Sequence, residues 1–141
     1  MKKVLVFVVF ALTLILTGCS EQQSKNEEEL KVNENIGEDM AIDTEQILDI
    51  MDSVIEENRD LTERELLVFE QYYIKYNGIY ENPESAAEPM TEEEERLFIL
   101  TKNIIENPEL YYTLESDKEA YKSQKKQIKN VIETGQIYDK E

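Results

Sequence analysis

The sequence contains no histidine, no tryptophan and a single cysteine, Cys19, among its 141 residues. Without histidine the chain cannot form a Ser-His or Cys-His catalytic pair, and zinc and copper sites lose their commonest ligand. One cysteine cannot form a disulfide within the chain, so an apolar core has to hold the fold together. The four glycines lie far apart, which excludes a glycine-rich phosphate loop. No cofactor is expected.

Basic residues are scarce, because 15 Lys and Arg stand against 32 Asp and Glu and give a net charge of −17. This balance argues against nucleic acid as a partner, since binding to phosphates needs clustered Lys and Arg. Carboxylates are the only plentiful reactive groups. A glycosidase-like pair of carboxylates needs an apolar or aromatic cleft, and acids on the outside of a small bundle provide little of that. We therefore expect no enzymatic activity.

Long uncharged runs are absent except at the start, where residues 4–17 follow Met1-Lys2-Lys3. About 20 apolar residues are needed to span the hydrocarbon core of a bilayer, so these 14 are too few. A positive start, a short apolar stretch and a small residue before a break are typical of a secretory signal peptide. We expect residues 1–18 to be that peptide.

Leu16-Thr17-Gly18-Cys19 resembles the lipobox of bacterial lipoproteins, in which an aliphatic residue, a small or β-branched residue and Gly, Ala or Ser precede Cys. The resemblance covers about the first 20 residues and implies cleavage between Gly18 and Cys19, with diacylglycerol on the cysteine sulfur. Two acyl chains hold a protein at a membrane where one chain does not. The alternatives are an uncleaved signal anchor and a secreted protein with a chance cysteine; the flanking residues do not favour eukaryotic palmitate.

The lipobox resemblance implies a cell-membrane location on the extracytoplasmic face, and abundant Lys, Glu, Ile and Asn with little Ala indicate a low-GC Gram-positive source. Residues 19–41 are polar and acidic and are predicted to be a lipid-anchored, disordered tether. Residues 42–135 are predicted to be a helical domain, and residues 136–141 a frayed tail. No convincing strand pattern is present, so we expect an all-α bundle of four, or five short, helices.

Capping patterns place the helices. The first is predicted to begin near residue 44, with Asp43 as N-cap. The second begins after Thr62, whose capping box includes Glu65, and its apolar residues run almost all round, which favours a central position. A third follows Thr91, and a short segment starts at Pro108. The last is predicted to begin at a Ser116–Glu119 box and to end at Gly135.

Two runs of charge have competing interpretations. Residues 117–141 carry 6 basic and 5 acidic residues, unlike the acidic chain before them. This pattern favours a basic last helix packed beside acidic helices; the alternative is a docking surface for an acidic partner. Residues 92–95 are four glutamates, which fit the first turn of a helix better than a calcium site, and no EF-hand spacing exists. We expect no specific metal.

Tyrosines are the remaining candidates for a site. Tyr72, Tyr76, Tyr111 and Tyr112 could form an aromatic face that binds a partner, although tyrosines at helical spacing are more often core residues. If any are exposed, we expect Tyr72 and one of the last two. The predicted function is a non-catalytic interaction module that binds an envelope protein. The alternatives are binding of a small molecule or glycan and, less favoured, a carboxylate-dependent wall-glycan enzyme.

Overall fold

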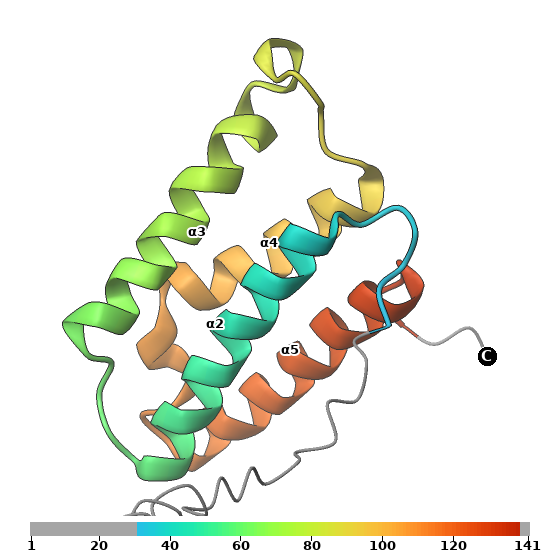
Figure 1. The fold of residues 1–141 in the computed structure, drawn as a ribbon. Coiled ribbons are helices and arrows are strands. Elements are labelled where there is room, and N and C mark those ends of the chain that lie inside the picture. The colour runs from blue at the N-terminus through green and yellow to red at the C-terminus, as the bar shows by residue number, and fades with distance from the viewer. Residues whose placement is uncertain (1–30, 139–141) are drawn as a thin grey trace, which may run out of the picture. The chain divides into compact units, whose positions relative to one another are not determined.

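The computed structural model describes residues 31–138, so Gly18, Cys19 and most of the predicted tether lie outside the described residues. Four helices follow one another: α2 (Glu38–Glu57), α3 (Glu63–Glu81), α4 (Glu92–Glu106) and α5 (Glu115–Thr134) (Figure 1). Short 3-10 turns, η1 (Pro83–Ser85) and η2 (Pro108–Tyr111), lie between α3 and α4 and between α4 and α5. Residues 31–138 contain no strand, and the prediction of an all-α bundle of four helices is confirmed.

The core lies between α2, α4 and α5, with α3 packed against α2 and α4 (Figure 1). Each helix contributes an apolar stripe at three- and four-residue spacing, and full burial of one large aliphatic side chain stabilises the fold by about 1.5–3 kcal/mol. The largest fully buried apolar side chains are those of Ile47, Leu48, Met51, Val54, Leu97, Phe98, Ile104, Ile128, Val131 and Ile132.

The first helix begins earlier than predicted, because α2 starts at Glu38 with Gly37 as its N-cap. Asp43 is therefore an interior residue of the helix and not its cap. The predicted tether is also wrong for residues 31–41: Ile36 is only 5% exposed, and Met40 and Ala41 are buried with it. Ile36 and Ala41 occupy the two positions of a hydrophobic staple around Gly37.

Backbone hydrogen bonds fix residues 33–37 to the ends of two other helices. The Asn33 N–H donates to the Ile132 carbonyl at 2.7 Å, next to the end of α5. The Thr91 hydroxyl, at the start of α4, donates to the Asn35 carbonyl at 2.6 Å. These bonds satisfy polar groups that an isolated tether would leave to water, so this segment belongs to the helical domain.

The start of α3 agrees with the prediction, but its position does not. The Thr62 hydroxyl accepts from the Glu65 N–H, and the Glu65 carboxylate accepts from the Thr62 N–H. However, α3 is peripheral and buries only Phe69, Tyr72 and Tyr76. Its other apolar side chains include Leu66, Leu67 and Ile74, which are 47%, 54% and 67% exposed. Apolar residues almost all round α3 therefore did not imply a central position, because the helix packs against α2 and α4 along one side only.

The last helix ends as predicted but begins differently. Its first turn is capped by Asp117, whose carboxylate accepts from the Leu114 N–H at 2.7 Å, and not by a Ser116–Glu119 box. At the other end Gly135 adopts a left-handed φ of 75° and donates its N–H to the Val131 carbonyl. The predicted fraying is wrong for residues 136 and 137, since the Gln136 carbonyl accepts from Asn130 and Ile137 packs against the core, whereas Tyr138 is 72% exposed. Residues 139–141 lie outside the described residues.

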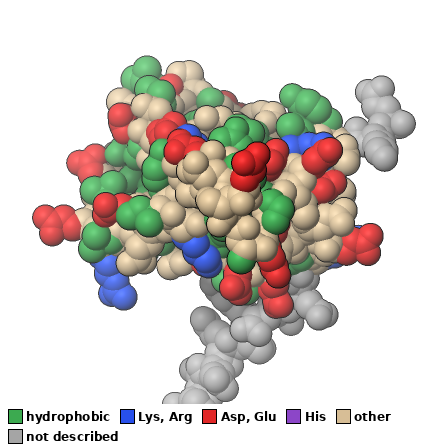
Figure 2. Space-filling model, turned by 90° about the horizontal axis from the view of Figure 1, so that it is seen from above, with side chains coloured by type: hydrophobic (Ala, Val, Ile, Leu, Met, Phe, Trp, Pro, Cys, Tyr) green, Lys and Arg blue, Asp and Glu red, His purple; other side chains and the backbone are tan. Residues whose placement is uncertain are grey.

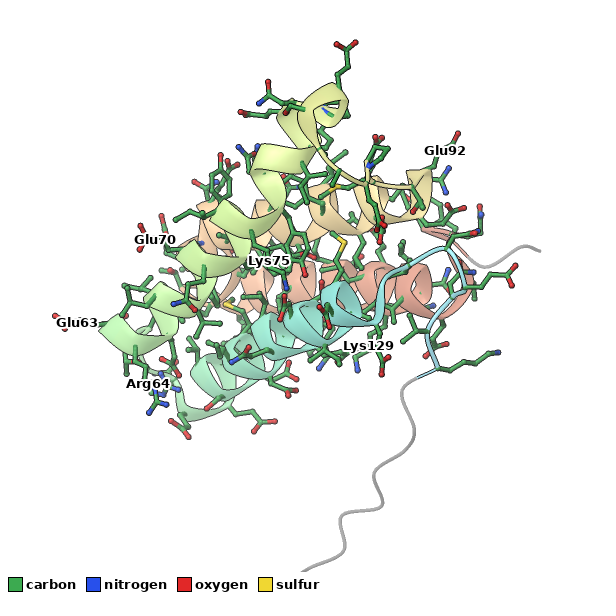
Figure 3. All side chains as sticks on the ribbon, turned by 45° about the horizontal axis from the view of Figure 1, so that its top comes forward. Glu63, Arg64, Glu70, Lys75, Glu92 and Lys129 are labelled. Atoms are coloured by element: carbon green, nitrogen blue, oxygen red, sulfur yellow. The ribbon has the colours of Figure 1, made fainter. Side chains whose placement is uncertain are left out.

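Lysines of α5 pair with acids of α2, as the internal interpretation of the basic last helix predicts. Lys125 forms an ion pair with Asp52, and the Lys129 Nζ lies 3.2 Å from a carboxylate oxygen of Glu45. On the opposite flank of the bundle, Lys75 lies on the side of α3 that faces α2, whereas Glu63 and Glu70 point away from the bundle (Figure 3).

Candidate functional site

Two of the four tyrosines predicted for a partner face lie in the core. Tyr72 is 3% exposed, so it is a core residue and not the one expected at the surface if any tyrosine were exposed. Its hydroxyl is 3.0 Å from the hydroxyl of Thr44. Burial raises the pKa of Tyr72 to about 12, although the contact with Thr44 opposes the shift. The buried hydroxyl of Thr44 explains how a phenol is accommodated in an apolar core.

Tyr76 is 6% exposed and donates its hydroxyl to the Asp43 carboxylate at 2.7 Å. Lys75 binds the same carboxylate oxygen, also at 2.7 Å. Burial, followed by the hydrogen bond to Asp43, raises the pKa of Tyr76 far above its ordinary value. Asp43 therefore ties α2 to α3, which is the role it plays in place of the predicted N-cap.

A second tie of the same composition connects α2 to α5. Tyr121 donates its hydroxyl to the Asp52 carboxylate at 2.9 Å and lies 3.0 Å from the Leu48 carbonyl, while Lys125 pairs with Asp52. Asp52 follows Asp43 by nine residues, which is half a turn beyond two full turns of an α-helix. The two carboxylates thus leave α2 on opposite sides, one toward each neighbouring helix.

The other two predicted tyrosines are half-buried in η2 and just after it. The Tyr111 ring packs edge-on against the Tyr121 ring, with centroids 6.4 Å apart. Burial raises the pKa of both Tyr111 and Tyr112. Because Tyr72 and Tyr76 are buried, the four tyrosines do not form one exposed aromatic face.

A groove with a volume of about 490 Å³ lies where residues 34–37 and the end of the α3–α4 connection meet α2 and α3. Its floor is apolar and includes Ile36, Met40, Ile79 and Met90, together with the side chain of Tyr76. The volume falls within the range of binding sites for small ligands. The whole lining is Glu34, Asn35, Ile36, Gly37, Met40, Tyr76, Ile79, Glu88, Pro89, Met90, Thr91 and Glu94.

Glu94 holds two walls of this groove together. One of its carboxylate oxygens accepts from the Gly37 N–H at 2.9 Å, and the other accepts from the Thr91 N–H at 3.0 Å. Gly37 and Thr91 are the N-caps of α2 and α4, so one carboxylate binds the starts of two helices. Negative charge is favourable at both of these helix ends.

The rim of the groove carries two further carboxylates that are not engaged. Glu34 and Glu88 are exposed, and neither forms a hydrogen bond or ion pair within residues 31–138. No Lys or Arg is among the lining residues. Figure 2 views the molecule from the end that carries the α3–α4 connection, where acidic side chains lie among apolar ones. The groove therefore combines an apolar floor with a negative rim.

A smaller hollow of about 240 Å³ lies along the same side of the α2–α3 pair and is lined by Asp43, Gln46, Val68, Gln71, Tyr72 and Lys75. Its only basic lining residue, Lys75, is bound to Asp43. Asp43 also binds the hydroxyl of Tyr76, a lining residue of the groove. This polar cluster therefore links the linings of the two hollows.

The four glutamates at the start of α4 act as the helix-start interpretation predicts. All four lie in its first turn, Glu94 completes the capping box, and Arg96 contacts Glu92 and Glu93 at 3.1 and 3.7 Å. Glu92 points outward in Figure 3. Within the described residues, no three His, Cys, Asp or Glu side chains are grouped so that they could hold a metal ion.

The groove was not predicted from the sequence. Its lining combines residues near position 36 with residues near position 90, which no local pattern brings together. The available signal was the staple of Ile36 and Ala41, which places the start of α2 next to the groove. No family model matches the chain, and comparisons with curated proteins and with solved structures find no match either. None of the helices in residues 31–138 has the length and apolar character that a membrane span requires.

Proposed function

We propose that the chain is a bacterial lipoprotein whose helical domain acts as a non-catalytic protein-interaction module on the extracytoplasmic face of the cell membrane. The observation that carries this proposal is Leu16-Thr17-Gly18-Cys19, placed directly after a positive start and a short uncharged run. Cleavage before Cys19 and attachment of diacylglycerol would anchor the protein by two acyl chains. The segment between Cys19 and residue 31 would then connect lipid and domain.

The interaction role is supported by what the domain presents to solvent. The groove has unengaged acids at its rim, and the outer side of α3 carries exposed Leu67 and Ile74. Many other charged side chains are already occupied in helix caps and ion pairs, as Glu94 and Asp52 are. Recognition of a partner protein makes use of such partly apolar surfaces and requires no reactive side chain.

Binding of a small molecule or glycan is a second candidate, which the volume of the groove favours. The tyrosine face that motivated it does not support it, because Tyr72 and Tyr76 are buried. A glycan ligand would have to stack on other groups. A carboxylate-dependent enzyme acting on wall glycan remains the least favoured candidate.

Anchorage is tested with a Cys19→Ala variant expressed in a Gram-positive host, with Ser20→Ala as the matched control. We expect wild type and Ser20→Ala to incorporate radiolabelled palmitate and to fractionate with membranes. Cys19→Ala should take up no label and retain residues 1–18 or appear in the medium. A Cys19→Ala protein that is processed and retained on the membrane like wild type would refute lipid anchorage.

The interaction role is tested by chemical crosslinking in intact cells that carry the anchored wild-type protein. We expect one envelope protein to be enriched over a control lipoprotein of similar size and charge. Recovery of no enriched protein from correctly anchored material would refute the interaction role while leaving the anchor in place.

A further inference from the structure

We propose that the groove binds a peptide segment in which apolar side chains are flanked by lysine or arginine. This inference rests on the proposed function, because it names the partner chemistry of the interaction module. Two features of the groove support this inference. The floor is apolar, and the rim carries the carboxylates of Glu34 and Glu88, which have no partner within the described residues.

The floor selects apolar side chains. Ile36, Met40 and Tyr76 form its base, and Ile79 and Met90 are half-buried beside them. Tyr76 is only 6% exposed and its hydroxyl is already bound to Asp43, so it closes the base of the groove and offers a ligand no free polar group. Methionine adapts to ligands of different shape, which suits a site for aliphatic side chains. A volume of about 490 Å³ is sufficient for several such side chains.

The rim selects the charge of the ligand. Of the three lining acids, Glu94 is occupied by the N–H groups of Gly37 and Thr91, whereas Glu34 and Glu88 are unengaged. With no lining Lys or Arg to offset them, these two carboxylates favour a cationic ligand over an anionic one. Being exposed, they contribute mainly to specificity and association rate, and the floor provides most of the affinity.

The charge of the chain itself argues against the other occupants. Residues 19–30 include four glutamates and one lysine, and residues 139–141 include two acids and one lysine. Either segment would bring negative charge to a negative rim. A second copy of the chain would do the same, since its net charge is −17. A basic segment of another molecule is the occupant whose charge is complementary.

The test uses the full chain in nonionic detergent and a fluorescently labelled peptide, acetyl-Lys-Lys-Ile-Leu-Lys-Lys-amide. The matched probe replaces each lysine with glutamate. We expect the basic peptide to bind with fluorescence anisotropy that saturates, and the acidic peptide not to bind. Amide chemical shifts should change at the lining residues, Ile36 and Met90 among them. Binding should weaken as salt is raised, because the rim is exposed to solvent.

The variant Glu34→Gln/Glu88→Gln should bind the basic peptide about fivefold more weakly, the combined effect of two screened surface charges. The control, Glu56→Gln/Glu109→Gln, removes the same charge from exposed residues that do not line the groove and should bind within twofold of wild type. Equal binding of both peptides, equal loss in both variants, or no binding at millimolar peptide would each overturn the inference. If the peptide result is negative but crosslinking still recovers a partner, only the inference about the groove has failed. If the peptide binds as expected but crosslinking recovers no partner, the proposed interaction role has failed.

Discussion

Alkaline pH is expected to destabilise the domain through three buried tyrosines. Tyr72, Tyr76 and Tyr121 are 3%, 6% and 3% exposed. Burial raises the pKa of Tyr72 to about 12, and it raises the pKa of the other two still further, where nearby Asp43 and Asp52 add to the effect. In the unfolded chain each phenol should lose its proton near pH 10.

The sign of the effect follows from proton binding. Above pH 10 the folded state holds the three protons that the unfolded state releases, so the free energy of unfolding falls as pH rises through the folded pKa values. At pH 11 each tyrosine costs about 1.4 kcal/mol, and the three together cost about 4 kcal/mol. Domains of this size are commonly stable by about 5–15 kcal/mol, so the loss is a large share of the total.

The assay is urea unfolding followed by circular dichroism at pH 8 and pH 11. With an m-value of about 1.5 kcal/mol per molar urea, the midpoint should fall by about 3 M. In unfolded peptides lysine also loses its proton in this range. A comparison of variants is therefore needed to separate the tyrosines from the lysines.

Tyr72→Phe removes one of the three phenols, and Tyr138→Phe is the matched control, because Tyr138 is 72% exposed. At pH 8 the Tyr72→Phe protein should be about 1 kcal/mol less stable than wild type, since the Thr44 hydroxyl loses its partner. Between pH 8 and pH 11 it should lose about 1.4 kcal/mol less than wild type, whereas Tyr138→Phe should match wild type. Equal losses in all three proteins would refute the role of buried phenols.

Three further predictions address the caps and the N-terminal segment. Hydrogen bonds from Arg59 lower the pKa of Glu65 to about 2, so the stability that this carboxylate contributes is present above its ordinary pKa of 4.5 and is lost as pH falls toward 2. Between pH 7 and pH 2.5, the free energy of unfolding from urea titrations should fall by about 1 kcal/mol less in Glu65→Gln than in wild type. An equal fall in both proteins would contradict this prediction. Gly135→Ala should cost about 1 kcal/mol, because φ is 75° there, and an unchanged melting temperature would contradict this. Ile36→Ala should lower the free energy of unfolding in urea by about 2 kcal/mol, and the exposed control Ile42→Ala by less than about 0.5 kcal/mol. Equally small losses in both variants would mean that residue 36 does not pack in the core.

Helix starts were predictable where the cap is made by residues close in sequence. Thr62 and Thr91 each bind the backbone N–H three residues ahead, so local spacing alone identifies them. Asp43 has the same local chemistry, yet it lies inside α2, which begins at Glu38, and it binds Tyr76 and Lys75 of another helix. A carboxylate that can cap a helix can also bind side chains of another helix, and the local spacing of residues does not distinguish these two roles.

The orientation of α3 was not predictable from its own sequence. Leu67 and Ile74 are as apolar as the residues that the helix buries, so the pattern leaves the inward stripe undetermined. Which side of α3 faces the core depends on the polar groups of the neighbouring helices. Tyr72 faces inward, where its phenol oxygen lies 3.0 Å from the hydroxyl of Thr44 in α2.

The groove and the stability of the domain depend on the same side chain, Glu94. Its carboxylate joins Gly37 to Thr91, 54 residues apart in the chain, and so holds the segment that begins α2 against the start of α4. In composition, Glu94 does not differ from the other three of four consecutive glutamates. Only its position three residues after Thr91 gives it the capping role, and only the fold brings Gly37 within reach. The remaining lining acids, Glu34 and Glu88, have no such structural duty, which leaves their charge available to a ligand.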